Sequence, residues 1–542
     1  MIKRARIGRT EQLSQGMTIR TGRAIFLLVF FSVLHSPAAN AAEGENFDIW
    51  RGTYRISYES LKVSPQESMG LAGLHYLFDL SPRFSAGATV FGAVSGKRGG
   101  FFTGGLEVAF RQPVFNDLRA EAGLFVGGGG GGAAPQGGGL MLRPYAGLLY
   151  ALRDFDVGLQ YARIDFPNGH ITSDHVAVTL GMPFDLLFVH PGYRGELSAL
   201  PDKASSAAGK EVGFSHSSFS PVYQVYFPAA GAKDTDGRTK TKSFGTLGLA
   251  YLWGYNGHTY RLAEAAGAVE GGADGFAEFF IGSGHRRALF NSDGTNRLFL
   301  DWRIAAGAAG GGSVDTGGGF ALKTSLGLQY FFYPAVAADL SVGYLASTGG
   351  HFRAATAAFE IAYHADFLSL ESGSSSRTAA DDLYLSSWQA GLFHQTYQTH
   401  DPRVRTSAPI SLLGMKLMKA LTPALYVTGQ AWGAYDGDAG GYAVGLLGLR
   451  LMSGPVLAER IRFFLEASAG GAGGGGVPVG GGAVAQGMAG VALDIDRSIS
   501  MEVSYGKIEA IHGVLDSTVI EAGFVYRFSA LGRKINQAGP GR

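Results

Sequence analysis

Near its C-terminus the chain reads VIEAGFVYRF (residues 519–528), a segment in which two kinds of residue alternate. Phe524, Tyr526 and Phe528 share one phase of this alternation, whereas Glu521 belongs to the other phase, which is mostly small or polar. A period of two residues is typical of a β-strand, because successive side chains of a strand point to opposite faces. The segment therefore predicts a final strand with one apolar, aromatic face.

Strands of the same kind surround a glycine cluster that occurs three times in the chain. Each cluster follows one strand-like segment and precedes two more, the second of which carries Tyr161, Tyr344 or Tyr505 in its apolar phase. Such internal self-similarity indicates a repeated structural unit. The clusters are Gly127 to Gly132 with Gly137 to Gly139, Gly310 to Gly312 with Gly317 to Gly319, and Gly473 to Gly476 with Gly480 to Gly482.

Each copy has room for about eight strands of roughly ten residues, the length that crosses the membrane in a tilted barrel. Short turns, such as residues 80–83, follow even-numbered strands, and the glycine clusters follow odd-numbered ones. Because barrels have short periplasmic turns and longer outer loops, the clusters are expected on the outer side. The predicted division is a signal peptide at 1–41, repeats at 45–185, 214–367 and 386–528, periplasmic linkers at 186–213 and 368–385, and a polar C-terminal tail at 529–542.

These patterns predict an all-β fold, a transmembrane antiparallel β-barrel of about 24 strands built from three eight-strand repeats. Two closures are compatible with the patterns, because the polar segments between the copies could be long turns within one barrel or linkers between separate barrels. A single barrel of about 24 strands is preferred, since one closed structure is the commoner way to use tandem strand units. Three tandem eight-stranded barrels are the alternative.

The composition fits a membrane barrel and excludes other classes. Of 542 residues, 46% are hydrophobic, 16% are charged, 84 are glycine and none is cysteine, so disulfides and thiolate metal sites are excluded. The formal net charge of +1 gives no reason to expect nucleic acid as a partner. Two arginines precede an apolar run from Ala24 to Leu34 and a small-residue site at Ala39-Asn40-Ala41, which is the pattern of a signal peptide.

Gly523, Phe524, Tyr526 and Phe528 resemble the C-terminal β-signal that the outer-membrane assembly machinery reads, although this chain continues beyond the aromatic residue that usually ends the signal. One repeat resembles the small outer-membrane barrel superfamily, which includes passive scaffolds, adhesins and lipid A deacylases. The resemblance implies a place in the bacterial outer membrane. Its implied partners are outer-membrane lipid, lipopolysaccharide and the assembly machinery, and a periplasmic or secreted partner of unknown identity is compatible with it.

A lipid A deacylase would need a histidine, a serine and an acid at one rim of a barrel. His170, Ser173, Asp174 and His175 supply these residue types, but polar loops often do so by chance, and His351 in the next copy has no equivalent serine. The first glycine cluster lacks the Lys-Ser/Thr pair and the helix of a phosphate-binding loop. The sequence therefore predicts no catalytic residue, no metal ligand and no cofactor.

The glycine clusters have a more physical use, because glycine lets a strand pair bend or lets another backbone approach closely. Flexible loop tips are the competing explanation. A lumen of about 24 strands would be wide, so the sequence predicts an outer-membrane channel or export pore of unknown substrate, without enzymatic activity. A non-transporting surface or scaffold protein is the alternative, and a lipid A-modifying enzyme is the third hypothesis. The candidate constriction or outer-hairpin residues are Gly127, Gly132, Gly310, Gly312, Gly473 and Gly476.

Overall fold

The structure is a computed structural model that describes residues 47–193, 195–208, 212–256, 258–289, 297–370, 380–399, 409–456 and 459–535. The predicted signal peptide at 1–41 lies outside the described residues. The described part contains 24 β-strands, two short 3-10 helices and one α-helix, α2 (Leu200–Ala208). Among the described residues, no helix is long and apolar enough to cross a membrane. The predicted all-β class is confirmed.

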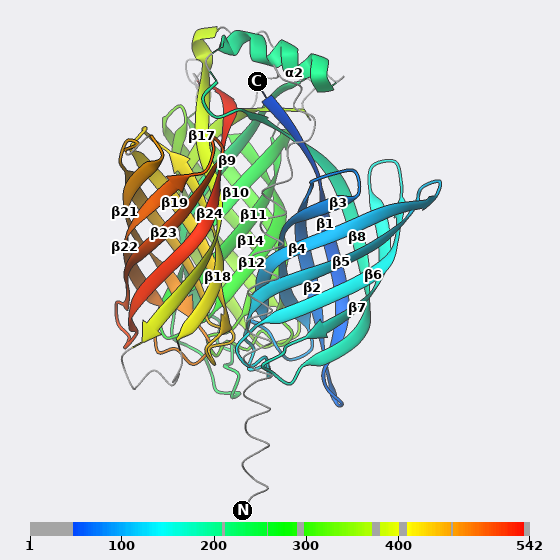
Figure 1. Cartoon of the computed structure of the whole chain (residues 1–542). Helices are drawn as coiled ribbons and strands as arrows, with labels where there is room; N and C mark the ends of the chain where they lie inside the picture. The colour runs from blue at the N-terminus through cyan, green and yellow to red at the C-terminus, as the bar shows by residue number, and fades with distance from the viewer. Residues whose placement is uncertain are drawn as a thin grey trace, which may run out of the picture.

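The strands form three consecutive groups of eight (Figure 1). The first group is β1 (Phe47–Ser64), β2 (Glu67–Asp79), β3 (Phe84–Ser95), β4 (Phe102–Phe115), β5 (Leu118–Gly130), β6 (Met141–Ala151), β7 (Asp156–Asp165) and β8 (Thr172–Val189). The second is β9 (Gly213–Pro228), β10 (Phe244–Asn256), β11 (Thr259–Glu270), β12 (Ala277–Ala288), β13 (Leu298–Gly310), β14 (Phe320–Tyr333), β15 (Val336–Ser347) and β16 (Arg353–Ser369). The third is β17 (Leu383–Thr399), β18 (Ile410–Ala420), β19 (Leu425–Asp436), β20 (Ala443–Met452), β21 (Ile461–Gly473), β22 (Ala483–Asp494), β23 (Ile499–Ala510) and β24 (Asp516–Arg533).

Each group closes on itself, because its last strand pairs antiparallel with its first. β1 pairs with β8 over 13 residue pairs, β9 with β16 over 14, and β17 with β24 over 17. The chain therefore forms barrel 1 (β1–β8), barrel 2 (β9–β16) and barrel 3 (β17–β24). The number of strands and the three eight-strand units agree with the prediction. The preferred closure into one barrel of 24 strands is wrong, and the alternative of three tandem barrels is the arrangement observed.

The lengths of the closing strands give the physical reason for this outcome. β1 and β8 have 18 residues each and β17 and β24 have 17 and 18, so each closing pair is long enough for a continuous ladder of 13 or 17 residue pairs. Eight strands also enclose an interior that side chains can fill completely. Both closures need the same alternation of residues within each strand, so the alternation in the sequence could not separate them.

Compared with a soluble protein, the barrels have the opposite arrangement of side chains, with apolar residues outside and charged residues inside. On β8, the outward-facing Val176, Val178, Leu180 and Met182 are exposed, whereas the alternate residues are buried. The fully buried side chains include Arg55, Arg143, Arg286 and Arg450. Tyr161, Tyr344 and Tyr505 are exposed on outer faces, as their phase predicted. Apolar residues outside and charged residues inside are what a barrel surrounded by lipid requires.

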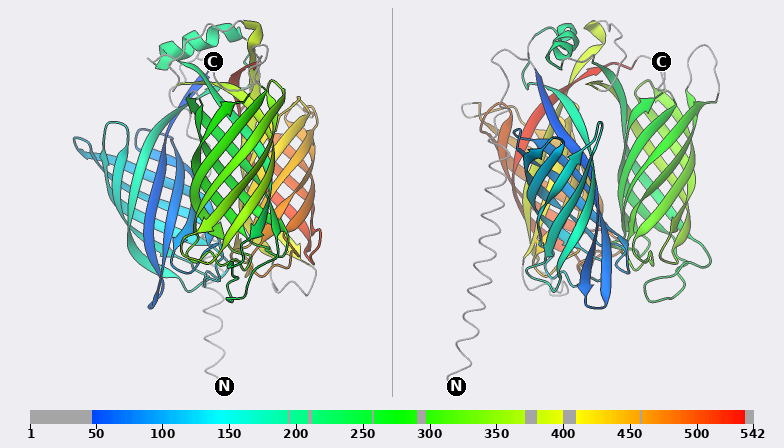
Figure 2. Two further views of the ribbon diagram at one scale, coloured as in Figure 1. Left: turned by 180° about the vertical axis from the view of Figure 1, so that it is seen from behind. Right: turned by 90° about the vertical axis from the view of Figure 1, so that its right-hand side faces the viewer.

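The end of the molecule that carries α2 ties the three barrels together (Figure 2). An apolar cluster there combines residues from all three barrels with Leu200 and Ala204 of α2. β24 continues beyond Phe528, so that Ser529 pairs with Val189 of barrel 1 and Arg533 pairs with Asp366 of barrel 2. The tail predicted from residue 529 therefore begins only after Arg533, because its first residues complete this contact; residues 536–542 lie outside the described part. The other members of the cluster are Phe47, Leu187, Val189, Val212, Leu368, Leu370, Leu383 and Leu531.

Candidate functional site

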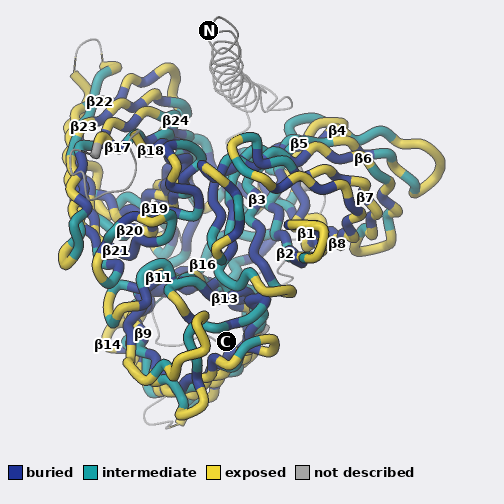
Figure 3. The backbone as a smooth tube through the Cα atoms, turned by 90° about the horizontal axis from the view of Figure 1, so that it is seen from below, coloured by how far each residue is buried: buried dark blue, intermediate teal, exposed yellow. Residues whose placement is uncertain are grey.

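Figure 3 shows the three barrels side by side, seen from the end opposite α2. At this end, glycine hairpins of the three barrels contact one another. We use the word seam for each contact between the glycine cluster of one barrel and a hairpin of the next. Gly139 of barrel 1 packs on Ala434 of barrel 3, and Gly319 of barrel 2 packs on Ala93 of barrel 1. Gly482 of barrel 3 packs on Ala268 of barrel 2. The three seams therefore form a closed ring with pseudo-threefold symmetry.

Backbone geometry explains why glycine is required in the seams. A Cβ atom on Gly139, Gly319 or Gly482 would lie less than 3.0 Å from the carbonyl oxygen of the alanine that it faces. All three glycines also have positive φ angles, of +96°, +97° and +101°, which L-residues with a side chain rarely adopt. Any larger residue would therefore push two barrels apart and strain its own backbone.

The alanines face the seams in a fixed geometry, because each closes an equivalent hairpin. The N–H groups of Ala93, Ala268 and Ala434 donate to the carbonyls of Phe101, Phe276 and Tyr442, each at 2.9 Å. The aromatic side chains of these three partners are buried inside their own barrels. The repeated hairpin thus anchors itself in its barrel and presents its backbone to the neighbouring glycine.

Hydrogen bonds cross two of the seams. The N–H of Gly99 donates to the carbonyl of Gly317 at 2.8 Å, joining barrels 1 and 2. Between barrels 3 and 1, the N–H of Gly441 donates to the carbonyl of Gly129 at 3.1 Å, and Gln136 Nε2 donates to the carbonyl of Gly440 at 2.8 Å. In a low-dielectric setting such bonds are stronger than in water, so they fix the register of one barrel against the next.

The six glycines selected from the sequence occupy different surroundings. Gly310 and Gly473 lie in seams, where they face Gly100 and Gly275 of the neighbouring barrels. Gly127, Gly132 and Gly312 instead face backbone of their own barrels, and Gly476 faces open space. Other residues of the same hairpins, Ala134, Val314 and Val479, belong to the buried apolar clusters of their own barrels. A constriction formed by these hairpins stays a prediction. Gly139, Gly319 and Gly482, the residues that make the equivalent contacts, were not singled out, although they stand in the second run of each cluster.

The residues of the expected assembly signal lie at the contact between barrels 3 and 1. Phe524 packs near Leu106 of barrel 1. The Tyr526 and Phe528 rings lie 4.9 Å and 4.6 Å from the rings of Trp50 and Phe188, between centroids. Gly523 makes room for the Phe393 ring inside barrel 3. Recognition by the assembly machinery stays a prediction, but the same aromatic face has a second use in holding two barrels together.

The lumen of barrel 1 is crossed by buried ion pairs. Arg55 on β1 donates to both carboxylate oxygens of Glu121 on β5, at 2.8 Å each, and these two strands lie on opposite sides of the barrel. Arg143 on β6 bonds to Glu59 on β1 at 2.7 Å. His75 also contacts Glu107 at 2.6 Å. Because the side chains of both arginine pairs have no exposed area, the pairs fill the barrel at its middle.

Barrels 2 and 3 contain equivalent networks built from different residues. In barrel 2, Arg303 bonds to Glu360 at 2.6 Å, and Lys323 bridges Glu264 and Glu278. In barrel 3 the buried cations are Lys416 and Arg450, and their partners are Glu466, Glu502 and Glu521 at 2.7 to 3.1 Å. Buried charges persist only where they are paired in this way. Single-sequence reasoning missed these networks, because isolated charges in alternating strands show no spacing that pairs them.

Three of the residues considered for lipid A deacylation, Ser173, Asp174 and His175, are not brought together on one face of their strand. Ser173 is buried and accepts a hydrogen bond from the Lys62 N–H at 3.0 Å, and His175 contacts Glu59 inside barrel 1. Asp174 lies between them in sequence but faces outward, 3.5 Å from Arg163. Strand alternation separates the acid from the other two side chains.

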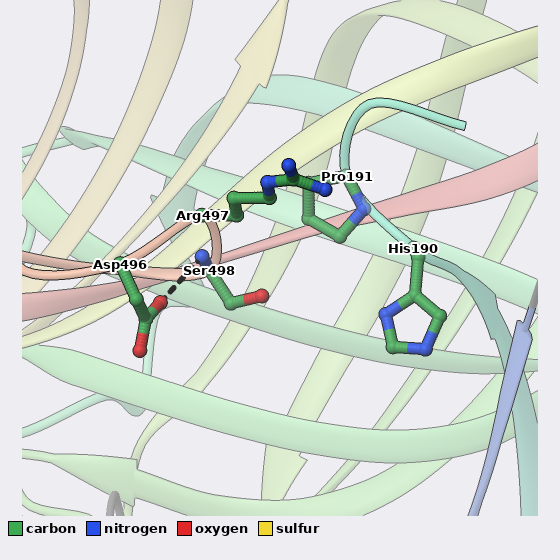
Figure 4. Close-up of a pocket in the computed structure, with 5 residues that line it drawn as sticks. All are labelled: His190, Pro191, Asp496, Arg497 and Ser498. Carbon is green, nitrogen blue, oxygen red and sulfur yellow. Dashed lines mark hydrogen bonds between the residues drawn. The ribbon is translucent and has the colours of Figure 1, made fainter. Parts of the chain in front are cut away.

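A shallow hollow lies at the α2 end of the molecule, between the end of barrel 1 and a turn of barrel 3 (Figure 4). Its cavity volume is about 370 Å³, and its lining is His190, Pro191, Asp496, Arg497 and Ser498. The Asp496 carboxylate accepts a hydrogen bond from the Ser498 N–H at 2.7 Å, which closes the turn. Across the hollow, His190 Nε2 lies 3.4 Å from a carboxylate oxygen of Asp48 in barrel 1.

The closed ladders, apolar outer faces and charged interiors define a transmembrane β-barrel protein of the bacterial outer membrane. No protein-family model and no curated protein sequence matches the chain. Among solved structures, the siderophore receptor PirA from Pseudomonas aeruginosa is 9% identical over 88% of this chain and 80% of that chain, with a TM-score of 0.26. OccAB3 from Acinetobacter baumannii is 11% identical over 89% of this chain and 99% of that chain, with a TM-score of 0.20. A bacterial polysaccharide outer-membrane secretin is 9% identical over 88% of this chain and 97% of that chain, with a TM-score of 0.20.

Proposed function

We propose that this protein is a membrane-embedded scaffold of the outer membrane, in which three barrels form one rigid platform without a wide pore. The observation that supports this most directly is the set of buried ion pairs across every lumen. A pore that conducts solutes would need a continuous polar space, whereas Arg55, Arg143 and Arg450 are fully buried among their partners. Eight-stranded barrels commonly have interiors filled by side chains.

The contacts between the barrels support the same proposal. Seams at one end and the apolar cluster with α2 at the other hold the barrels at two levels. Between these levels, outward-facing Leu392 and Leu413 of barrel 3 are buried beside Leu106 of barrel 1. Small residues at the contact let backbones approach closely, as in other tightly packed membrane interfaces. Such a platform holds three sets of outer loops in fixed positions.

Single-channel recording of the full-length protein in a planar bilayer tests the proposal. We expect no conductance steps of the size of a water-filled pore. A matched variant should replace the plug of barrel 1 with small residues, as Arg55→Ser, Glu121→Ser, Arg143→Ser and Glu59→Ser, which leaves the net charge unchanged. Steps that appear only in this variant would support the scaffold with plugged lumens. Large, steady steps from the unmodified protein would refute it.

A narrow ion channel is the second candidate function, and the lumen of barrel 2 favours it. Both carboxylate oxygens of buried Asp339 lack a hydrogen bond, and so do Nε and Nη1 of Arg286. The nearest cation to Asp339 is Arg303, whose Nη2 lies 3.6 Å away. Buried polar groups are normally satisfied by protein or by water, so these atoms mark the point where water and small ions would enter. Small steps abolished by Asp339→Asn alone would favour this candidate.

A further inference from the structure

The loop between β9 and β10, residues 229–243, differs from the corresponding connection of barrel 1, which is only Pro65 and Gln66. It extends beyond the strand ends on the side opposite α2 (Figure 2). By the rule that long loops lie outside, this is the outer surface of the membrane. The loop carries four basic and two acidic residues: Lys233, Arg238, Lys240, Lys242, Asp234 and Asp236.

The acidic residues of the loop are already engaged within it. Asp234 Oδ1 accepts hydrogen bonds from the N–H groups of Asp236 and Arg238, at 3.0 and 2.8 Å. Asp236 forms an exposed ion pair with Arg238 at 3.7 Å. The loop is also tied to the β13–β14 hairpin through a bridge between Asp234 and Val314. The basic side chains are thus displayed on a loop with defined shape.

One basic side chain is held more deeply than the others. Lys240 lies with its Nζ 5.8 Å from the centre of the Phe244 ring and 3.5 Å from the carbonyl of Gly312. Its partial burial lowers its pKa from the usual value, and Asp234 and Asp274 oppose that effect. Lys240 therefore anchors the loop, and the surface charges are those of Lys233, Arg238 and Lys242.

Arg353 adds a charge at the edge of the lipid-facing surface that lies opposite α2. It begins β16, is exposed, and precedes the outward-facing Phe359 and Ile361 on the same face of that strand. Phe227 on β9 is also exposed and pairs with Ala355, two residues from Arg353. Aromatic residues mark the membrane interface of a barrel. Arg353 therefore lies at the level of lipid headgroups, next to the loop. Neither Arg353 nor Lys242 has an ion-pair partner among the described residues.

We propose that Arg238, Lys242 and Arg353 bind the phosphate groups of the glycolipid in the outer leaflet, lipopolysaccharide. Clustered basic residues beside a membrane surface attract anionic headgroups, and charge-assisted hydrogen bonds to phosphate are strong and directional. The position at the edge of the lipid-facing surface favours a lipid phosphate over a free anion. This goes beyond the scaffold function and does not depend on whether the lumens conduct.

The test uses full-length protein in detergent, with lipid A carrying both phosphates as the probe and dephosphorylated lipid A as the comparison. The variant is Arg238→Gln, Lys242→Gln and Arg353→Gln. Its matched control is Arg83→Gln, Arg153→Gln and Lys203→Gln, which removes the same charge from exposed residues at the α2 end. Native mass spectrometry measures bound lipid, and a thermal melt of each variant checks that it is folded.

We expect the first variant to lose affinity for phosphorylated lipid A about tenfold or more, with no change for the dephosphorylated lipid. The control variant should bind both lipids like the unmodified protein. Equal losses in both variants would show a general charge effect and overturn the proposal. Tight binding of inorganic phosphate that displaces lipid A would also overturn it, because the site would then be one for free anions.

Discussion

At the scale of single residues, two kinds of side chain environment decide the structure. Glycine is required in the seams because the backbones of two barrels touch there and leave no room for a side chain, as at Gly482 and Ala268. Charged side chains can be buried in the lumens because each is paired with carboxylates, as Arg450 is with Glu466 and Glu502. The glycine clusters were visible in the sequence and were correctly connected with close approach as one of their uses. Their partners were not visible, since nothing in a single sequence tells which hairpin of another barrel faces a given glycine.

A pair of substitutions in one hairpin separates the contact from the backbone strain. Gly482→Ala places a Cβ against the carbonyl of Ala268, whereas Gly481→Ala has the same φ, +101°, but its Cβ would meet only ordinary contacts, the nearest at 3.7 Å. We expect Gly482→Ala to lower the free energy of unfolding by about 1–3 kcal/mol more than Gly481→Ala. Urea unfolding in lipid vesicles, followed by tryptophan fluorescence, measures the difference. Equal effects of the two substitutions would show that the seam tolerates a side chain.

Removing one member of a buried pair should be more damaging than removing an exposed one. Arg450→Met leaves the Glu502 carboxylate buried without its cation, which we expect to cost about 3–5 kcal/mol of stability. Adding Glu502→Gln should recover part of the loss, because no charge is then left unpaired. The control is Arg163→Met, whose partner Asp174 is exposed at the surface and whose pair is worth about 1 kcal/mol or less. The heat-modified shift of each variant on gels gives its unfolding temperature, and an Arg450→Met protein as stable as the control would contradict the account.

At the scale of elements, the sequence predicted the strands and their faces correctly, but it did not predict where the last strand ends. The alternation predicted that Tyr161 and Gln160 lie on opposite faces of β7. The structure confirms this, because Tyr161 is exposed and Gln160 is buried. The last strand was expected to end at Phe528, yet β24 runs on to Arg533. The residues beyond Phe528 are mostly polar or small, apart from Leu531, and were predicted to be a tail. They continue the strand because they pair with barrels 1 and 2. That pairing is a tertiary contact with no local signal.

The extension of β24 leads to a cross-linking prediction. Ser529 and Val189 are paired between barrels 3 and 1, so Ser529→Cys with Val189→Cys should form a disulfide under mild oxidation. The chain has no other cysteine, which keeps the background low. Ser529→Cys with Asp185→Cys is the control, because Asp185 lies four residues back along β8 and pairs with β1. Mass spectrometry of peptides should find the link only in the first protein; similar yields in both would show that β24 does not take this position.

At the scale of the whole molecule, the class of fold and its repeats followed from the sequence, but the closure did not. Hydrophobic alternation, turn lengths and glycine clusters report on each strand and hairpin separately. Whether β8 continues to β9 or returns to β1 depends on matching of whole strands, which no local pattern reports. The predicted function depended on this choice, because a wide lumen exists only in a single barrel. With three closed barrels, the plugs and seams become the features that a function must explain.

The most direct test of the three-barrel account asks which strand lies beside β8 in the membrane. Ser57 on β1 is paired with Thr179 on β8, and both side chains face the lumen of barrel 1. Ser220 on β9 is buried inside barrel 2. The account predicts that Thr179→Cys forms a disulfide with Ser57→Cys in nearly all molecules of the membrane-inserted full-length protein, and forms none with Ser220→Cys. A link from β8 to β9, with none from β8 to β1, would contradict it and restore the single barrel.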